Sequence, residues 1–481
     1  MLFNSLDFAI FLPIVFIGYW FLFNKTLKSQ NLFTLASSYF FYGCWDWRFL
    51  SLILFSTIVD YNISIALSSQ ANIIRRKFLL SVSVLINLGF LAFFKYYNFF
   101  LDNFITAFSF FGKEISASSL DIILPVGISF YTFQTLSYTI DVYNKKLDPI
   151  KNIIAFSAFV SFFPQLVAGP IERAKNLLPQ FQKRRIFKND IAIDGVKQIL
   201  WGLFKKVVIA DNCAFFCNEI FNNSSSYNGS TLVLGAILFS FQIYGDFSGY
   251  SDIAIGVAKL FGFKLMNNFS YPYFSRDIAE FWRRWHISLT TWFRDYLYIP
   301  LGGSRVSRVM VIRNVLIVFL VSGFWHGANW TFLFWGALNG ILFLPLILRQ
   351  KNRKNIDDTS NHFYFLPSFK DFFSMLFTFA LITLCWVFFR AESLTHAFQY
   401  LNGIFSSSFF TFPLVTFKLG LLVLLISYML TIEWFGRFSE HPLKNLRTSK
   451  NFIFSVSLYS SIFVLIIWFA GKQQDFIYFQ F

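Results

Sequence analysis

Two histidines and a group of arginines between Tyr271 and His326 are the residues of this 481-residue chain whose types and spacing could do chemistry. The histidines are His286 and His326. An imidazole, whose unperturbed pKa is about 6.5, can take a proton from a hydroxyl near neutral pH. A guanidinium presents a planar fork of N–H donors that suits phosphate groups. The arginines of this stretch are Arg276, Arg283, Arg284, Arg294, Arg305, Arg308 and Arg313.

His326 lies inside an apolar segment, in the motif Ser-Gly-Phe-Trp-His-Gly-Ala-Asn-Trp of residues 322–330. An ionisable side chain is costly in such surroundings and usually has a function there. Gly323 and Gly327 allow the backbone to bend or to approach a neighbour closely, which predicts an interrupted helix at His326. The alternative is a neutral, hydrogen-bonded histidine of the protein interior.

A single amphipathic helix is predicted from Arg276 to about Tyr298. Its apolar residues recur at helical spacing: Ile278, Phe281, Trp282, Trp285, Leu289, Trp292 and Phe293. This pattern is typical of a helix that lies in the headgroup layer of a membrane. The alternative is that its arginines only meet lipid phosphates and its tryptophans belong to the aromatic belt. That alternative does not account for His286 at the centre of the stretch.

A third polar cluster lies within an apolar segment, from Tyr244 to Asp252, and contains Asp246, Ser248 and Asp252. Carboxylates in such a segment should face protein or water and should be paired. The spacing is not that of a Gly-x-Ser-x-Gly nucleophile elbow. We therefore expect Asp246 and Asp252 to pair with the arginine-rich stretch rather than to act directly in catalysis.

Several classes of chemistry lack a motif. The chain contains no Walker sequence, no His-Glu-x-x-His and no Cys-x-x-Cys, so neither ATP hydrolysis nor a metal site is predicted. Cys213 and Cys217 are one helical turn apart without a further ligand nearby, and are interpreted as packing residues. No role is assigned to the remaining histidines, His362, His396 and His441.

The composition is that of a polytopic all-α membrane protein. The chain is 56% hydrophobic and only 14% charged, whereas soluble domains are roughly 25% charged. A helix needs about 20 residues to cross a bilayer, so 31–43 and 312–324 are too short for simple spans and 78–111 is too long. Residues 153–170, interrupted by prolines, are predicted to be re-entrant. The predicted apolar segments are 6–23, 31–43, 49–68, 78–111, 122–143, 198–221, 231–262, 312–324, 328–348, 370–390, 414–435 and 452–470.

The net charge of +16 is assigned to the cytoplasmic loops of a membrane protein rather than to nucleic-acid binding. Lysine and arginine concentrate in alternate loops, above all in 172–206 and 264–313, which places both termini outside the cytoplasm. The N-terminal apolar segment is expected to be retained as the first span. We expect one integral membrane domain, 1–481, with N-terminal helices in 1–120, a core in 121–348 and C-terminal helices in 349–481.

Five stretches resemble the membrane-bound O-acyltransferases of bacteria, in the branch that O-acetylates alginate and peptidoglycan. They are LPVGISFYTFQTLSYTIDVY (124–143), SFFPQLVAGPIER (161–173), YGDFSGYSDIAIGVAKLFGF (244–263), NNFSYPYFSRDIAEFWRRWHISLTTWFRDYLYIPLGGSR (267–305) and FWHGANWTFLFWGALNG (324–340). They cover the middle half of the chain in the family's order. The fourth is long enough to be highly specific. Residues before about 120 and after about 390 match only as hydrophobic segments.

The resemblance implies about 11–13 transmembrane or re-entrant helices, arranged as a ring around a central tunnel in the bacterial cytoplasmic membrane. It matches His326 to the family's catalytic histidine and His286 to its second motif histidine. It also implies a partner, a periplasmic or surface protein resembling an acetyltransferase or esterase, that finishes the transfer to a polysaccharide.

The mechanism expected from this resemblance moves an acyl group from cytoplasmic acetyl-CoA, a substrate rather than a bound cofactor, toward a hydroxyl on the outer side. His326 would be the general base or a transient acyl carrier. His286 and Asn329 would orient the donor carbonyl or stabilise its oxyanion, supported by Trp285 and Trp325. The donor's phosphates would be held by some of Arg276, Arg283, Arg284, Arg294 and Arg305.

The acceptor stays open at this point. Phenylalanine makes up 71 residues and isoleucine, asparagine and lysine are abundant, which suggests an AT-rich genome and favours peptidoglycan over alginate. D-alanyl transfer to teichoic acid is a further alternative. A transporter of polysaccharide or lipid-linked sugar is an alternative of another class, although no internal repeat supports it. A non-catalytic scaffold for an enzyme on the outer face is the third class.

Overall fold

The structure is a computed structural model that describes residues 1–112, 118–167, 169–355, 366–413, 417–445, 452–471, 474, 476 and 477. Throughout these residues the regular elements are helices, which confirms the all-α prediction. Contacts divide the chain into two compact units, one of residues 1–195 and 254–266 and the other of residues 196–253 and 267–481. The expected single domain and the ring with a central tunnel stay predictions.

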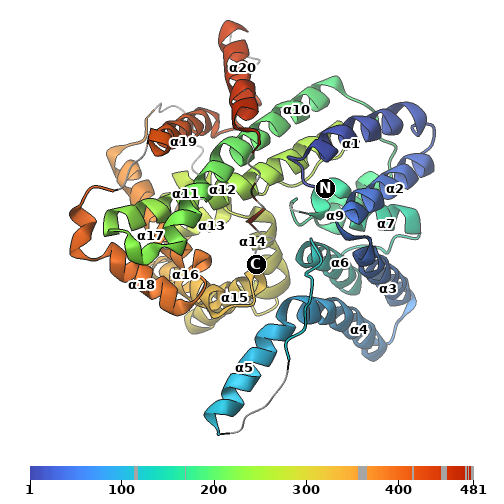
Figure 1. Cartoon of the computed structure of the whole chain (residues 1–481). Coiled ribbons are helices and arrows are strands. Elements are labelled where there is room, and N and C mark those ends of the chain that lie inside the picture. The colour runs from blue at the N-terminus through green and yellow to red at the C-terminus, as the bar shows by residue number, and fades with distance from the viewer. Residues whose placement is uncertain are drawn as a thin grey trace. The chain divides into compact units, whose positions relative to one another are not determined.

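The first unit consists of the blue and cyan helices of Figure 1. Its elements are α1 (Leu6–Ile17), η1 (Gly18–Leu22), α2 (Leu27–Asp46), η2 (Trp47–Phe49), α3 (Leu50–Ser69), α4 (Ile73–Leu91), η3 (Ala92–Tyr96), α5 (Tyr97–Phe110), α6 (Ile128–Tyr143), α7 (Ile153–Val160), α8 (Phe163–Leu166), α9 (Ala174–Phe181) and the start of α10 (Asn189–Leu203).

The second unit contains the candidate site. Its elements are the end of α10, η4 (Phe204–Ala210), α11 (Asp211–Asn222), η5 (Ser224–Ser226), most of α12 (Gly229–Leu260), η6 (Pro272–Phe274), α13 (Ile278–Arg284), α14 (Ile287–Phe293), η7 (Arg294–Tyr298), α15 (Arg308–His326), α16 (Trp330–Leu348), α17 (Phe369–Arg390), α18 (Leu394–Ile404), η9 (Ser407–Phe410), α19 (Phe417–Gly436) and α20 (Phe452–Phe469).

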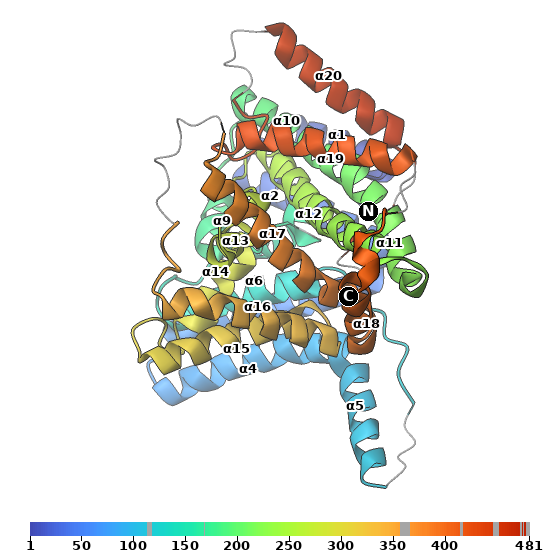
Figure 2. The same cartoon turned by 90° about the vertical axis from the view of Figure 1, so that its left-hand side faces the viewer.

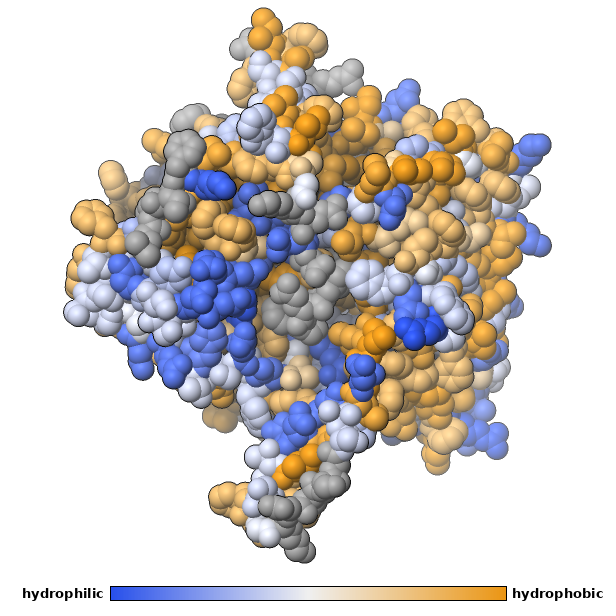
Figure 3. Space-filling model, in the orientation of Figure 1, coloured by the Kyte–Doolittle hydropathy of each residue, from blue (hydrophilic) through white to orange (hydrophobic). Residues whose placement is uncertain are grey.

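Eight helical stretches among the described residues are long and apolar enough to cross a membrane. Apolar side chains cover the surface over α1 in Figure 3, where Leu6, Ile10 and Ile14 are exposed. A surface of this kind is stable against lipid and would be unfavourable against water. The protein is therefore a multi-pass membrane protein. The eight stretches are Leu27–Ser69, Ile73–Phe110, Gly229–Leu260, Arg308–His326, Trp330–Leu348, Phe369–Arg390, Lys418–Gly436 and Phe452–Phe469.

Two segments that were expected to be too short are full-length helices. Segment 31–43 lies within α2, which has 20 residues, and segment 312–324 lies within α15, which has 19. The prediction stopped at polar residues near the segment ends. In α2 the polar residue just before the segment, Gln30, is buried inside the protein, where its Oε1 accepts the Arg185 backbone N–H at 3.3 Å.

Other predicted segments differ from the observed helices in where the helix is continuous and where it is interrupted. Segment 78–111 is one helical run, α4–η3–α5, in which a π-turn contains Lys95. The helical run 189–222 contains the predicted segment 198–221 but is not a candidate span, because it carries several charges. The predicted re-entrant segment 153–170 contains two short buried helices, α7 and α8, while its residue 168 lies outside the described part of the chain. Residues 414–416 of the predicted segment 414–435 also lie outside it.

A buried polar network joins three helices of the first unit. The Asp60 carboxylate of α3 accepts hydrogen bonds from Ser83 and Asn87 of α4 and from Thr139 of α6. Asn87 in turn accepts the Ser56 hydroxyl at 2.9 Å. Polar groups inside apolar surroundings are stable only when they are hydrogen-bonded, so this network selects one packing of the three helices.

Glycines allow the helices of the second unit to approach closely. A Cβ atom at Gly202 of α10 would lie 2.6 Å from the Gly249 carbonyl of α12, and one at Gly249 would lie 2.8 Å from the Gly202 carbonyl. Only hydrogen fits at both positions. This contact brings η4, which directly follows α10, against the middle of α12.

Candidate functional site

His326 is the last residue of α15, and its side chain is buried in an aromatic surrounding. The rings of Trp325, Trp335 and Phe389 lie 5.0, 5.2 and 5.3 Å from the imidazole, centroid to centroid. The helix ends because Gly327 is extended, with φ −166°, and α16 begins three residues later. The predicted interruption at His326 is confirmed.

The position of His326 depends on the close packing of α15 against α16, which lie side by side in Figure 2. A Cβ atom at Gly323 would lie 2.3 Å from the Phe332 carbonyl oxygen, and one at Gly327 would lie 2.1 Å from the Phe332 ring. Gly336 makes the reciprocal close contact with the Phe319 carbonyl at 2.4 Å. The glycines are therefore required by close approach, as the sequence predicted.

His286 lies between two short helices, and the single helix predicted from Arg276 to Tyr298 is wrong. α13 ends at Arg284, and His286 adopts the left-handed conformation, φ 44° and ψ 53°, before α14 begins. The break is held by hydrogen bonds of Ser270 N–H to the Arg284 carbonyl and of Ile287 N–H to the Asn268 carbonyl. The apolar residues of the stretch are buried in protein, which explains why their helical spacing did not indicate the break.

The side chain of Asn268 determines which nitrogen of His286 carries the proton. Asn268 Oδ1 accepts the Ser288 backbone N–H at 3.3 Å and the Ser288 hydroxyl at 2.9 Å, so this atom is the amide oxygen. His286 Nδ1 lies 3.0 Å from the same oxygen and must donate to it. Burial lowers the pKa of His286 to about 3, so the ring is neutral. The neutral ring then has its lone pair on Nε2, where it can accept a proton or a hydrogen bond.

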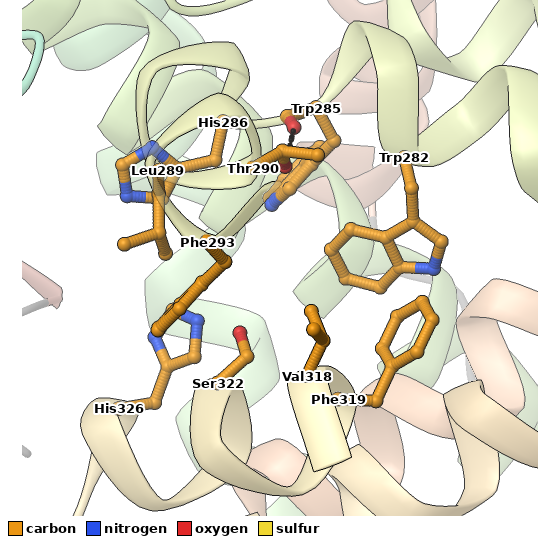
Figure 4. A pocket seen from close by; sticks show the side chains of 10 residues that line it. All are labelled: Trp282, Trp285, His286, Leu289, Thr290, Phe293, Val318, Phe319, Ser322 and His326. Atoms are coloured by element: carbon orange, nitrogen blue, oxygen red, sulfur yellow. Dashed lines mark hydrogen bonds between the residues drawn. The ribbon is translucent and has the colours of Figure 1, made fainter. Parts of the chain in front are cut away.

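Both histidines line one cavity of about 50 Å³. Figure 4 shows His286 and His326 at one end of the cavity, Ser322 and Val318 along the α15 side, and Trp282 with Phe319 at the other end. Two imidazoles beside a small apolar space can take a proton from a hydroxyl and return it to a leaving group while water is largely excluded. The other lining residues are Trp285, Leu289, Thr290 and Phe293.

The residues predicted to support the histidines have different positions. Trp285 lines the cavity, and the ring of Trp325 lies 6.0 Å from that of His286. Asn329 does not line the cavity. Its Oδ1 caps α16 by accepting Thr331 N–H, and its Nδ2 donates to the Glu392 carbonyl. Both polar atoms of its amide are thus used at the start of α16, and the role of Asn329 at the donor carbonyl stays a prediction.

The five candidate arginines do not line the cavity in the described structure. Arg276 and Arg284 both bind Glu280, with nitrogen–oxygen distances of 3.1 and 2.7 Å. Glu280 is buried and neutralises part of the positive charge that the sequence suggested for a phosphate site. These two arginines hold α13 in place, and the bound carboxylate makes them weak candidates for the donor's phosphates.

Of the other three arginines, Arg294 and Arg305 are exposed and Arg283 is half-buried. Arg294 pairs with its neighbour Asp295 at 2.8 Å. Arg283 donates through Nη1 to the Asn352 carbonyl at 2.8 Å. Its Nη2 is buried without a hydrogen-bond partner among the described residues, and burial lowers the pKa of this side chain. All three arginines thus retain N–H donors, and those of Arg294 and Arg305 are at the surface.

The polar cluster of α12 is paired, but with lysines rather than with the arginine-rich stretch. Asp246 binds Lys206 at 2.8 Å, and Asp252 binds Lys205 at 2.6 Å. Ser248 accepts a hydrogen bond from Lys205 at 2.8 Å. The expected arginine partners are wrong because the glycine contact between α10 and α12 brings η4, which carries both lysines, to this position. That the role of the cluster is structural stays a prediction.

The histidines without an assigned role lie outside the cavity or outside the described residues. His396 is on α18, with Nε2 3.4 Å from the Ser224 hydroxyl. His441 is in a turn and is buried, although a polar loop was expected. His362 lies in the part of the chain that the structure does not describe.

Two residues of the site were missed. Ser322 precedes His326 by one helical turn, so the expectation of a helix that ends at His326 could have placed it on the same face. Asn268 has no local signal in the sequence. It meets His286 only because residues 268–270 run beside residues 284–287.

Comparisons with known proteins find a matching family and several similar chains. The family described as MBOAT, membrane-bound O-acyltransferase family, matches residues 145–389, about half of the chain and including both histidines. The peptidoglycan O-acetyltransferase of Helicobacter pylori is 35% identical over 100% of this chain and 98% of the relative. The probable alginate O-acetylase of Azotobacter vinelandii is 40% identical over 84% of this chain and 78% of the relative.

A relative with lower identity and coverage is named for the transfer of a different acyl group, D-alanyl. The teichoic acid D-alanyltransferase of Streptococcus thermophilus is 30% identical over 48% of this chain and 59% of the relative. The match of the family over half the chain and the full-length likeness to a relative are sufficient for assignment. This chain is an acyltransferase that belongs to the membrane-bound O-acyltransferase family.

Proposed function

We propose that the protein moves an acetyl group from cytoplasmic acetyl-CoA across the membrane for the O-acetylation of an extracytoplasmic polysaccharide, and that this polysaccharide is peptidoglycan. The observation that carries the proposal is the cavity shared by His286 and His326, with a neutral His286 whose tautomer Asn268 determines. Such a cavity suits transfer between a thioester and a hydroxyl, which needs a base and a dry site but no metal or nucleotide hydrolysis.

His326 is the general base in this proposal. It takes the proton of the attacking hydroxyl as the oxygen forms its bond to the acyl carbon, and gives the proton to the sulfur when the carbon–sulfur bond breaks. Ser322 presents a hydroxyl to the cavity one turn before His326 and is suited to donate to the carbonyl oxygen. His286 presents a lone pair at Nε2, so it orients the hydroxyl by accepting its hydrogen bond rather than by stabilising an oxyanion.

The favoured contact for the phosphates of the donor is the group formed by Arg283, Arg294 and Arg305, because Arg294 and Arg305 are exposed and Arg283 keeps a donor at Nη2. The basic loops that contain it would face the cytoplasm by the positive-inside rule, with both termini on the outer side. The enzyme would lie in the bacterial cytoplasmic membrane. It would act with an extracytoplasmic partner that completes the transfer to polysaccharide.

Peptidoglycan is favoured as the acceptor because the likeness to the Helicobacter pylori peptidoglycan O-acetyltransferase extends over the whole chain, whereas the alginate relative matches 84% of it. The amino-acid composition, which suggests an AT-rich genome, also favours peptidoglycan over alginate. Alginate acetylation is the second candidate, favoured by the higher identity of 40%. D-alanyl transfer is supported by a match over less than half of the chain.

Membranes containing the protein and its genomic neighbours, supplied with acetyl-labelled acetyl-CoA and peptidoglycan, test the proposal. We expect label in peptidoglycan with the wild type, no detectable label with His326→Ala, and normal labelling with the matched variant His396→Ala. Full activity of His326→Ala at equal protein amount would show that another group is the base. Label in alginate alone would replace the acceptor, and movement of a sugar without acetyl transfer would favour the transporter.

A further inference from the structure

The cavity beside the two histidines is closed at its far end by aromatic side chains. The Trp282 and Phe319 rings lie 5.5 Å apart, edge to face, and Trp335 packs against Trp282 from the other side at 5.6 Å. Trp282 and Trp335 are buried, so this wall is supported from behind. Figure 4 shows Val318 between the wall and Ser322.

The register of α15 places these groups at set distances from His326. Ser322 is one turn before His326 and Phe319 almost two turns before it, which at 1.5 Å per residue corresponds to ~6 and ~10 Å along the helix axis. A carbonyl carbon beside His326 and Ser322 would therefore have its alkyl chain directed along α15 toward Val318 and Phe319. The chain can extend only until it meets these side chains.

The volume of the space matches a short acyl group. A cavity needs roughly 10–15 Å³ of such volume to hold one water, and this one has about 50 Å³. It therefore has room for about three to five groups of that size, and an acetyl group has three non-hydrogen atoms. At the far end Trp282 presents an indole N–H, which is a donor and cannot accept from an ammonium, beside the apolar side chains of Val318 and Phe319. The space therefore favours a methyl group over a charged group such as the ammonium of D-alanine.

We propose that Val318, Phe319 and Trp282 select the acyl group by size, and that they restrict this enzyme to uncharged two-carbon groups. This inference rests on the proposed function, because it assumes that the acyl carbon lies beside His326 during transfer. A tightly packed wall rejects added methylenes because its side chains and the backbone behind them would have to move. In a hydrophobic pocket one methylene changes selectivity by about 10- to 200-fold.

The test compares donors of different length with the full-length protein. Membranes that contain the genomic neighbours together with wild type, Phe319→Ala, Val318→Ala or the control Leu320→Ala are each given acetyl-, propionyl- and butyryl-CoA, and acyl transfer to peptidoglycan is measured. Leu320 follows Phe319 on the same helix, is exposed and does not line the cavity. The ratio of butyryl to acetyl transfer is the readout, because it does not depend on the fraction of folded protein.

We expect the butyryl-to-acetyl ratio to rise by at least about 10-fold in Phe319→Ala and to rise in Val318→Ala as well, with Leu320→Ala equal to the wild type. Either enlarged variant suffices if the other does not fold. Acetyl transfer by the wild type with an unchanged ratio in both variants overturns the inference and leaves the proposed function intact. A folded wild type that transfers none of the three groups overturns the proposed donor and the inference with it.

Discussion

Asn268 offers a sharp test of the site, because it acts on His286 without touching the cavity. Replacing it with leucine keeps a similar side-chain size but removes the oxygen that accepts from His286 Nδ1 and from Ser288 N–H. The Ser288 hydroxyl can rotate toward another acceptor, whereas the two N–H groups have fixed directions. Asn268→Leu should therefore disturb both the stability of the α13–α14 break and the tautomer of His286.

The expected magnitude follows from the number of donors affected. A buried donor that loses its acceptor costs about 1–3 kcal/mol, so the two N–H groups together lower the free energy of unfolding by about 2–6 kcal/mol. Of these two hydrogen bonds, the rate of acyl transfer depends only on the one from His286 Nδ1 to Asn268 Oδ1. A preference of about 1–3 kcal/mol for one tautomer and orientation corresponds to about 5- to 150-fold in rate.

The assay measures acetyl transfer in membranes that also contain the genomic neighbours, and the thermal unfolding midpoint on the detergent-purified protein. Asn339→Leu is the matched control, because Asn339 is equally buried but donates only to the Trp335 carbonyl of its own helix. We expect Asn339→Leu to transfer acetyl at the wild-type rate per folded molecule. Wild-type transfer by folded Asn268→Leu would refute the view that Asn268 controls His286.

Asn268→Asp tests the same contact by charge. The Ser251 hydroxyl, which accepts from the Asn268 amide at 3.0 Å, can turn to donate to a carboxylate, so the hydrogen bonds are preserved. A carboxylate favours the imidazolium and raises the pKa of His286. As the pH falls toward 5, transfer by the variant should therefore decline, whereas wild-type His286, with a pKa of about 3, stays neutral. Superimposable pH–rate profiles would contradict this assignment.

Three further substitutions test the framework through the thermal unfolding midpoint. Gly323→Ala should separate α15 from α16, because its Cβ would lie 2.3 Å from the Phe332 carbonyl, and cost about 1–3 kcal/mol; an unchanged midpoint would argue against this contact. Lys206→Met should cost about 3–5 kcal/mol by leaving buried Asp246 without its cation, and adding Asp246→Asn should restore part of the loss. Asp60→Leu should cost about 1–3 kcal/mol for each donor that loses it as an acceptor, and a stabilised variant would contradict the network.

The membrane helices could be predicted because their signal is local. Lipid favours apolar side chains along about 20 consecutive residues, and each such run carries its own evidence. The ends of the helices were less predictable. Gln30, the polar residue just before segment 31–43, is buried within the first unit and accepts a hydrogen bond from the Arg185 backbone N–H. Burial of this kind depends on neighbours distant in the chain.

The pairing of the buried charges was likewise only partly predictable from the sequence. The sequence indicated that Asp246 and Asp252 must be paired, because an isolated carboxylate is unstable in apolar surroundings. It could not indicate that Lys206 and Lys205 are the partners. That choice depends on Gly202 and Gly249, which let α10 and α12 approach closely enough to bring η4 to the carboxylates.

The sequence by itself singled out His326 as the candidate catalytic group, because it is an ionisable residue between two glycines in an apolar segment. The tertiary structure decided what surrounds it. The break at His286, its hydrogen bond to Asn268 and the short cavity that ends at Phe319 all join residues far apart in the chain. The free-energy cost of burying a charge can be inferred from the apolar residues around it in the sequence. The shape of a cavity and the tautomer of a histidine depend instead on which distant side chains pack around them.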